Sequence, residues 1–311
     1  MLGPGGATFL GVERCTLGEP DTYKGADVVI VAAPGAGGAN HRPRARSGAS
    51  SARRPLPLRV DALRELRVLD AGEVEAFSET AESMAAIEEA VTAIAEAGAV
   101  PVVLGEHEAV TVPDVTGVAR HYGTGLAVIY FESAGRGPGP AARRLLESGT
   151  VRDDRFLRVG RRERLPVPEM PEVPERATCE GTRSYDTVQI GTRGVDSCVT
   201  EAMTIALDDC DAVFLSVDID VVGPERAAGI GASEPGAITP RQLLEAVRRL
   251  ACELPIVGME VVESSPPYQA DTTGFLGSRV VLEALSGIAS RRRGDAWSPA
   301  RSLLVGCGSL A

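Results

Sequence analysis

The sequence predicts an α/β fold in which a mainly parallel β-sheet is covered by helices on both faces. Strongly apolar segments such as 28–33 and 212–217 are typical of strands buried on both sides. Amphipathic helical segments alternate with them, which favours parallel strands joined by helical crossovers. The composition shows no break and no internal repeat, so we expect the 311 residues to form a single domain.

The expected elements follow from the positions of apolar runs and turn residues. Ser78 is a suitable N-cap for one helix and Gly98 lies near its end, while Thr239 caps a second helix that begins with Pro240. In chain order we expect strand 26–34, loop 35–55, helix 78–98, strands 99–105, 124–131 and 155–159, a Pro-rich loop at 164–175, strands 186–191 and 212–220, helix 239–253, strand 255–263 and helix 278–293.

Charge and composition exclude several classes of partner. A net charge of −11 argues against non-specific binding to nucleic acids or anionic membranes, and an aromatic content of 4% argues against base stacking. We find no apolar stretch long enough for a membrane span and no secretory signal. Scattered cysteines without a pairing pattern favour reduced thiols, so we expect a cytoplasmic protein. These cysteines are Cys15, Cys179, Cys198, Cys210, Cys252 and Cys307.

Asp218 and Asp220 are the most informative residues, because they end the strongest predicted strand. Side chains at i and i+2 of a strand point to the same face, so we expect both carboxylates on one side of the strand end. Such a pair suits a hard divalent cation. In parallel sheets active sites gather at the carboxyl ends of strands. His107, Glu132 and Glu263 follow three other predicted strands and are expected at the same edge.

Three segments carry a resemblance to a known family. They are SVDIDVVGPERAAGIGASEPGAIT at 216–239, VVESSPPY at 261–268 and APGAGGANHRPRARSGA at 33–49. They are similar to the Ser-Phe-Asp-x-Asp segment, the Glu-Val-Ser-Pro-Pro-Tyr segment and the Asn-Arg-Pro-Gly-Ala-Arg loop of the ureohydrolase superfamily, which contains arginases, agmatinases and related guanidino-acid amidinohydrolases. The sequence resembles the agmatinase branch most, over a core of about residues 8–287 with short extensions at both ends.

The resemblance implies a three-layer α/β/α domain with a mainly parallel, eight-stranded sheet. Members of the superfamily bind two manganese ions that share a hydroxide, and this hydroxide attacks the guanidinium carbon and releases urea. Their six metal ligands come from three motifs. On that pattern His107 matches a ligand histidine, Glu132 matches the bridging aspartate, and Asp218 and Asp220 complete the third motif. Glu263 matches a residue near the guanidinium end of the substrate.

Two ligand positions depart from the family pattern. Ala134 stands where a histidine is expected and Arg136 stands where an aspartate is expected. Alanine has no donor atom, and a guanidinium has no acceptor for a metal ion. The segment 137–144 also lacks the histidine that relatives carry past the second motif, and we expect the remaining His41 and His121 at the surface.

These departures leave two hypotheses for the site. In the first, Arg136 replaces a manganese ion as counter-cation to Asp218 or Asp220. In the second, His107, Glu132, Asp218 and Asp220 hold a single, weakly bound divalent ion, manganese if any. Glu106 and Glu108 flank His107, and we expect them either to orient its ring or to be exposed loop acids.

The function predicted from these residues is accordingly one of two. The first is a divergent family member that has lost two-manganese hydrolysis and acts as a non-catalytic partner or as a scaffold for a cationic guanidino or amine ligand. The resemblance implies assembly as a trimer or hexamer, either with itself or with an active relative. The second is an agmatinase-type amidinohydrolase, converting a guanidino compound and water to an amine and urea, with one metal or a rearranged metal site.

Overall fold

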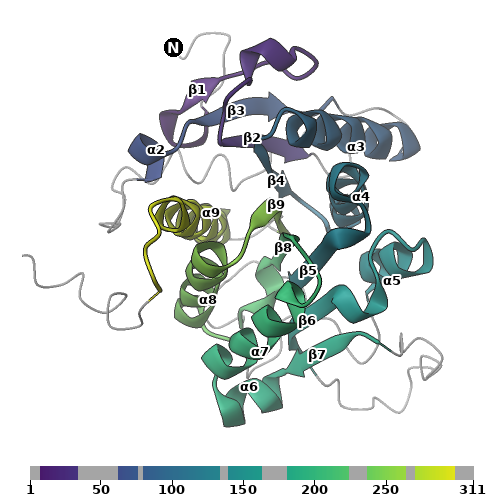
Figure 1. The fold of residues 1–311 in the computed structure, drawn as a ribbon, viewed down its shortest axis with the longest axis vertical. Helices are drawn as coiled ribbons and strands as arrows, with labels where there is room; N and C mark the ends of the chain where they lie inside the picture. Colours follow the sequence, from purple (N-terminus) through teal and green to yellow (C-terminus); the bar gives the residue numbers. More distant parts are fainter. Residues whose placement is uncertain are drawn as a thin grey trace, which may run out of the picture.

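The computed structural model describes residues 8–33, 62–75, 80–133, 139–162, 181–223, 237–263 and 270–297. Its strands are β1 Glu13–Arg14, β2 Val28–Ala33, β3 Val68–Glu73, β4 Val100–Gly105, β5 Leu126–Phe131, β6 Phe156–Arg161, β7 Arg183–Asp186, β8 Ala212–Asp218 and β9 Ile256–Val262. In this part of the chain they form one sheet in the order β1-β3-β2-β4-β9-β8-β5-β6-β7, and every pairing is parallel (Figure 1).

Helices cover both faces of this sheet. The α-helices are α2 Ala62–Glu65, α3 Thr80–Glu96, α4 Thr111–Tyr122, α5 Pro140–Glu147, α6 Thr187–Arg193, α7 Val195–Leu207, α8 Pro240–Glu253 and α9 Ala270–Arg292. The 3₁₀ turns are η1 Phe9–Gly11, η2 Pro20–Thr22, η3 Glu108–Val110, η4 Gly123–Gly125, η5 Asp153–Arg155 and η7 Ile219–Val221. Figure 1 shows α3, α4 and α5 on one side of the sheet and α6, α7, α8 and α9 on the other.

Each face of the sheet has its own apolar core. Along β5, Ala127, Ile129 and Phe131 join the core beneath α7, α8 and α9, whereas Val128 and Tyr130 join the core beneath α3, α4 and α5. Successive strand side chains point to opposite faces, so a strand buried on both sides must be apolar throughout. This confirms the predicted three-layer α/β/α fold class.

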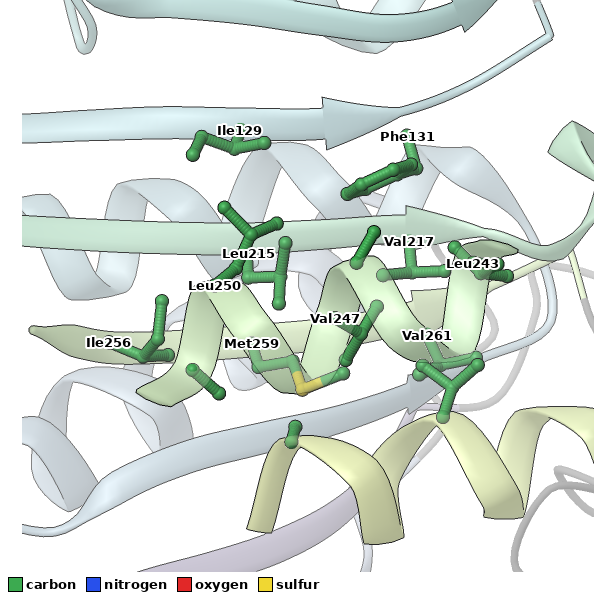
Figure 2. Close-up of a cluster of buried hydrophobic side chains, with 14 of the residues drawn as sticks. Ile129, Phe131, Leu215, Val217, Leu243, Val247, Leu250, Ile256, Met259 and Val261 are labelled. Atoms are coloured by element: carbon green, nitrogen blue, oxygen red, sulfur yellow. The ribbon is translucent and has the colours of Figure 1, made fainter. Parts of the chain in front are cut away.

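One part of the core lies between α8 and the centre of the sheet. Figure 2 shows Leu243, Val247 and Leu250 of α8 lying against side chains of β5, β8 and β9. The strand residues are Ile129, Phe131, Leu215, Val217, Ile256, Met259 and Val261. Full burial of one such side chain contributes roughly 1.5–3 kcal/mol to the free energy of folding. This packing fixes the position of β8 and β9, whose ends carry candidate site residues.

The predicted boundaries of α3 and α8 agree with the structure where they are described, whereas α9 begins at Ala270 and not at the predicted residue 278. Thr239 caps α8 with its Oγ1 accepting from the Gln242 N–H at 3.3 Å, while Gln242 Oε1 accepts from the Thr239 N–H at 2.8 Å. Pro240 is the first residue of that helix. Gly98, just past α3, has a φ of 79°, which glycine adopts without strain. Ser78 lies outside the described residues.

One predicted strand is wrong. The segment 186–191 begins α6, and the neighbouring strand β7 ends where this helix starts. Asp186 Oδ1 accepts from the Gln189 N–H at 2.7 Å, and Gln189 Oε1 accepts from the Asp186 N–H at 3.0 Å. This reciprocal capping box satisfies backbone donors that a strand would have paired elsewhere. It outweighs the strand preference of Val188 and Ile190.

The sheet also has one strand more than the expected eight, within the described residues. The additional edge strand β1 is two residues long and pairs with β3, too short to give an apolar pattern. The elements α2, β3, α5, β7 and α7 were not predicted from the sequence. Among the described residues, no helix combines the length and the apolar character needed to cross a bilayer. Cys15, Cys198, Cys210 and Cys252 are buried free thiols. The extent of the domain, 1–311, stays a prediction.

Candidate functional site at the carboxyl edge of the sheet

The sheet order brings the predicted site residues to one edge. Strands β4, β9, β8 and β5 are consecutive neighbours and run in the same direction, so their carboxyl ends lie side by side. These ends carry His107, Glu132, Asp218 and Glu263. The structure therefore places the candidates where the sequence predicted them, in the arrangement typical of parallel α/β sites.

The local geometry of the Asp218–Asp220 pair differs from the expected strand. Asp218 ends β8, but Asp220 lies in the 3₁₀ turn η7, and the Asp220 N–H donates to Asp218 Oδ1 at 3.0 Å. The predicted strand therefore ends at Asp218, and the turn, not strand alternation, brings the two carboxylates close enough to interact. Burial, and then the neighbouring charge of Asp220, raise the pKa of Asp218 well above its ordinary value.

Asp220 is held by residues that follow two other strands, β5 and β6. Its Oδ2 accepts from the Ser133 hydroxyl at 2.5 Å, and its backbone carbonyl accepts from Arg162 Nη2 at 2.6 Å. Its second carboxylate oxygen, Oδ1, is buried and accepts no hydrogen bond from the described part of the chain. The carboxylate of Asp220 is thus held by the Ser133 hydroxyl at Oδ2, and its Oδ1 remains available as an acceptor.

Glu132, at the position of the bridging ligand, forms an ion pair with Arg158. Arg158 Nε donates to Glu132 Oε1, and both side chains are only 2% exposed. Arg158 comes from β6, the strand beside β5, where it lies opposite Tyr130. Burial raises the pKa of Glu132, and the Arg158 guanidinium pulls it back down. The carboxylate that the family resemblance predicts as a bridging manganese ligand is engaged here by a cation of the chain itself.

His107 lies at the rim of the site. Its side chain is 63% exposed, and its Nε2 is 3.9 Å from Glu263 Oε1. Its Nδ1 accepts from the Ala109 N–H at 3.1 Å. A neutral imidazole that accepts at Nδ1 carries its proton on Nε2, so neither nitrogen then has a free lone pair for a metal ion.

Glu263 and Glu108 form the other side of the edge. Glu263 Oε1 accepts from the Glu108 N–H at 3.0 Å, and Glu263 adopts a φ of 55°, which is unfavourable for a residue with a side chain. Burial raises the pKa of Glu108; His107 lowers it, and Glu263 and Asp220 raise it further. Glu106 is buried, so the exposed-loop alternative is wrong for that residue.

Several predicted residues fall outside the described part of the chain. Ala134, Arg136 and His41 are among them, as is the sequence between β9 and α9. His121 lies exposed in the last turn of α4, as expected for a surface residue.

The described donors are not arranged to hold manganese. Within these residues no group of three or more His, Cys, Asp or Glu side chains is placed to bind one metal ion. Glu132 is paired with Arg158, and His107 uses its Nδ1 on the backbone. This part of the chain therefore does not fit the two-metal centre that the family pattern implies. The assignment of His107, Glu132, Asp218 and Asp220 as ligands stays a prediction.

A row of polar side chains beneath the edge was missed by the sequence analysis. Arg158, Tyr130, Ser216 and Glu260 lie opposite one another on β6, β5, β8 and β9, so they share one face of the sheet. All four are at most 2% exposed. The sequence contains a feature that could have predicted this row, because Arg158 and Glu260 are charged residues within otherwise apolar strands. A charge in a strand covered on both faces needs a partner.

Comparison with known proteins agrees with this fold and edge. The sequence model of the arginase family matches residues 26–287. The chain belongs to the arginase family. As an arginase-family protein it is 28% identical over 199 residues to a formimidoylglutamase of Bacillus subtilis, an alignment that spans 61% of each chain. It is 27% identical over 284 residues to an agmatinase of Chromobacterium violaceum, spanning 84% of each.

Solved structures extend the fold similarity of this arginase-family chain over almost its whole length. The proclavaminate amidino hydrolase of Streptomyces clavuligerus superposes with a TM-score of 0.75 at 20% identity, over 92% of this chain and 98% of that one. The formimidoylglutamase of B. subtilis superposes with a TM-score of 0.73 at 21% identity, over 93% and 96%. The resemblance and the fold class drawn from the sequence are confirmed.

Proposed function

We propose that this arginase-family protein does not carry out two-manganese hydrolysis of guanidino compounds, and that it acts as a non-catalytic subunit or ligand-binding scaffold. The observation that supports this most directly is the Glu132–Arg158 pair. A bridging carboxylate must offer both metal ions its lone pairs, and this one is buried against a guanidinium that cannot deprotonate.

The surroundings of Glu132 support the same conclusion. A manganese ion near Glu132 would face the positive charge of Arg158 in a buried, weakly screened environment, where charges repel strongly. Arg136 stands at another ligand position of the family pattern. Asp220 Oδ1, which accepts no bond from the described residues, is the acceptor that we propose for the Arg136 guanidinium. Two arginines would then balance the acids of the edge.

The ligand class that we propose is a cationic guanidino or amine compound. Burial raises the pKa of Glu108, and the nearby carboxylates of Glu263 and Asp220 raise it further, so negative groups gather at this edge. A negative edge of this kind attracts small cations. We further propose a cytoplasmic protein that assembles as a trimer or hexamer, with itself or with an active relative.

A second candidate function is an amidinohydrolase that uses one metal ion or a rearranged site. Two observations favour it. Asp220 Oδ1 accepts no hydrogen bond from the described residues, so it could bind a metal ion, and relatives of similar sequence carry the names of formimidoylglutamase and agmatinase. Asp218 and Asp220 would supply its carboxylates.

Metal content and turnover distinguish the two functions. The purified full chain is dialysed against manganese, its bound metal is measured, and urea or formamide release is followed with agmatine, guanidinobutyrate, arginine and formimidoylglutamate. We expect less than one tightly bound manganese per chain and no turnover above that of Asp218→Asn. Turnover that Asp218→Asn abolishes would establish the hydrolase instead.

A restoration experiment tests the role given to Arg158. Ala134→His with Arg136→Asp returns two ligand types of the family, and adding Arg158→Met frees Glu132. We expect tight manganese binding only in the triple variant. Arg161→Met, on the same strand, is the matched control and should not restore binding. Two manganese ions bound by the Ala134→His/Arg136→Asp variant with Arg158 intact would contradict the blocking role of Arg158.

A further inference from the structure

Two buried carboxyl groups, Asp114 and Glu260, lie apart from the strand-end residues and have no cationic partner among the described residues. Both residues are 0% exposed. Neither oxygen of Asp114 has a hydrogen bond in the described part of the chain, and neither has Glu260 Oε2. Buried carboxyl oxygens without partners are costly, so the pair needs a physical explanation.

The packing of α4 on β9 places these two residues against each other. A Cβ atom on Gly258 would lie 2.8 Å from Val118 Cγ2, so α4 approaches β9 closely at this point. Asp114 lies one helical turn before Val118, a rise of about 6 Å. Glu260 lies two strand residues beyond Gly258, a rise of about 6.6 Å.

Both steps, from Val118 to Asp114 along α4 and from Gly258 to Glu260 along β9, lead toward the carboxyl edge of the sheet. The helix follows β4 in a crossover, so it begins at the carboxyl edge and runs back along the sheet. At that edge a Cβ atom on Gly105 would meet both Val110 and Val262, at 3.3 and 3.0 Å. Asp114 and Glu260 therefore form the layer between the Val110–Val262 contact and the Val118–Gly258 contact.

The groups around the pair are neutral. Ser216 Oγ donates to Glu260 Oε1 at 2.6 Å. The Thr111 hydroxyl, on the same face of α4, lowers the pKa of Glu260 without meeting the geometry of a hydrogen bond. Tyr130 faces the pair from β5, and its own pKa is raised well above 10. From β4 the residue opposite Glu260 is Val103.

The charged groups of the neighbouring helices do not act on the pair. Glu88 of α3 forms an ion pair with Arg120 of α4, and α5 contributes Ala142 and Leu145 to the apolar core on this side. Glu260 is the only charge that shifts the pKa of Asp114 among the described residues. Two adjacent ionised carboxylates in such a place would repel each other without compensation.

We propose that Asp114 and Glu260 share one proton in the folded protein at neutral pH, and that this pair makes the α4–β9 contact sensitive to pH. The protonated carboxyl of one residue donates its O–H to the ionised carboxylate of the other. This hydrogen bond provides partners for carboxyl oxygens of Asp114 and Glu260 that otherwise have none among the described residues. When the proton leaves, two buried negative charges face each other between helix and sheet.

The direction of the pH effect follows from the shifted groups. Burial raises the pKa of Glu260 to about 7, and burial together with the charge of Glu260 raises that of Asp114. In the unfolded chain both protons leave near a pKa of about 4. The contribution of the pair to stability is therefore complete below about pH 4 and is lost as the pH rises through the folded-state pKa. Between these pH values the folded chain holds one proton more than the unfolded chain.

The test compares the pH dependence of folding in the wild type and in Asp114→Asn/Glu260→Gln, whose amides keep the shape of the pair. Glu108, Glu132 and Asp218 also have raised pKa values and add a slope of the same sign, so the difference between the proteins is the quantity of interest. Urea unfolding between pH 5 and 7 should show the folding constant of the variant rising relative to wild type by about tenfold per pH unit.

Asp70→Asn is the matched control. Asp70 is also 0% exposed, but its oxygens accept from the backbone N–H groups of Phe9 and Gly72, at 2.6 and 2.8 Å. This variant should keep the wild-type pH slope. A double variant at the pair with the wild-type slope, within twofold per pH unit, would overturn the proposal.

Infrared spectroscopy gives a second measurement that does not depend on unfolding. A protonated carboxyl has a carbonyl stretching band separate from the amide bands of the protein, and an ionised carboxylate lacks it. The difference spectrum between wild type and Asp114→Asn/Glu260→Gln at pH 6 should contain the loss of one such band. A metal or sodium ion between two ionised carboxylates would leave this band out of the difference spectrum, and that result would overturn the shared proton.

Discussion

Glu132 and Glu260 are two glutamates of the same sheet whose charges are balanced in different ways. Both are at most 1% exposed. Glu132 is paired with the guanidinium of Arg158, whereas Glu260 faces a second acid, Asp114, and the hydroxyl of Ser216. A permanent cation stabilises the charged form of the first carboxylate, and a proton balances the second only while the pH allows it.

The comparison shows how one sheet carries polar groups through an apolar interior. The row of Arg158, Tyr130, Ser216 and Glu260 spans four neighbouring strands. At one end Arg158 pairs with Glu132, and at the other end Glu260 interacts with Asp114. Breaking a charge pair leaves an uncompensated ion, while replacing both members by apolar groups removes the need for compensation. Substitutions at these residues test this difference, from the largest expected effect to the smallest.

Removing Arg158 should have the largest effect on stability. Arg158→Met leaves Glu132 buried without its cation, and we expect the free energy of unfolding at pH 7 to fall by about 3–5 kcal/mol. Urea unfolding followed by circular dichroism measures this change. Arg152→Met, which removes an exposed arginine paired with Asp154, is the control and should leave the midpoint unchanged.

A double substitution separates charge from packing. Glu132→Leu with Arg158→Met should recover most of the loss, to within about 1–2 kcal/mol of wild type, because no buried charge remains. If the double variant were as unstable as Arg158→Met alone, the ion pair would not be the origin of the effect, and the packing of the Arg158 stem would account for it.

The pH dependence of the wild type should be the next largest effect. The pKa values of Glu108, Glu132, Asp218 and Glu260 are raised, so the folded chain binds more protons than the unfolded chain above about pH 4. Stability should decrease as the pH rises from 5 toward 7, by about 1.4 kcal/mol per pH unit for each excess proton. Thermal unfolding at a series of pH values measures the slope, and stability that rises over this range would contradict it.

The same series distinguishes the two glutamates. The deficit of Arg158→Met should shrink at pH 5 relative to pH 8, because Glu132 takes up a proton once its cation is gone. A deficit that stays constant between these pH values would mean that Glu132 stays ionised without Arg158.

Single hydroxyl deletions should have smaller, graded effects. Ser216→Ala removes the donor to the fully buried Glu260 and should cost about 1–3 kcal/mol of unfolding free energy. Ser133→Ala removes the donor to the half-buried Asp220, which water can replace, and should cost about 0.5–1.5 kcal/mol. Parallel urea unfolding of both variants checks the order, and a larger effect for Ser133→Ala would reverse our view of which group is more isolated from water.

Much of the fold could be predicted because apolar runs and caps are local signals. The segments that became β8, α8 and β9 carry continuous apolar patterns or an explicit cap at Thr239. The segment 186–191 was predicted wrongly, since Val188 and Ile190 favour a strand while the decisive signal is the spacing of Asp186 and Gln189. The two-residue strand β1 gives no pattern at all.

The candidate site could be located from the sequence, but its partners could not. Motif spacing placed His107, Glu132, Asp218 and Glu263 at adjacent strand ends, as the sheet order requires. The cation that engages Glu132 comes from β6, and only the strand pairing brings Arg158 beside Tyr130. The turn at Asp220 depends on backbone geometry after β8. Long-range pairing of this kind leaves no periodic trace in one sequence.

The Glu132–Arg158 pair has a consequence for how the protein is produced. Both charges are built into the polypeptide during translation, so this part of the interior is electrically complete as soon as β5 and β6 have paired. A domain that depends on manganese reaches its native state only as fast as the cell supplies the ion. This chain carries the neutralising charge within itself, and under the proposed metal-free function the amount of folded protein is independent of manganese supply or depletion in the cell.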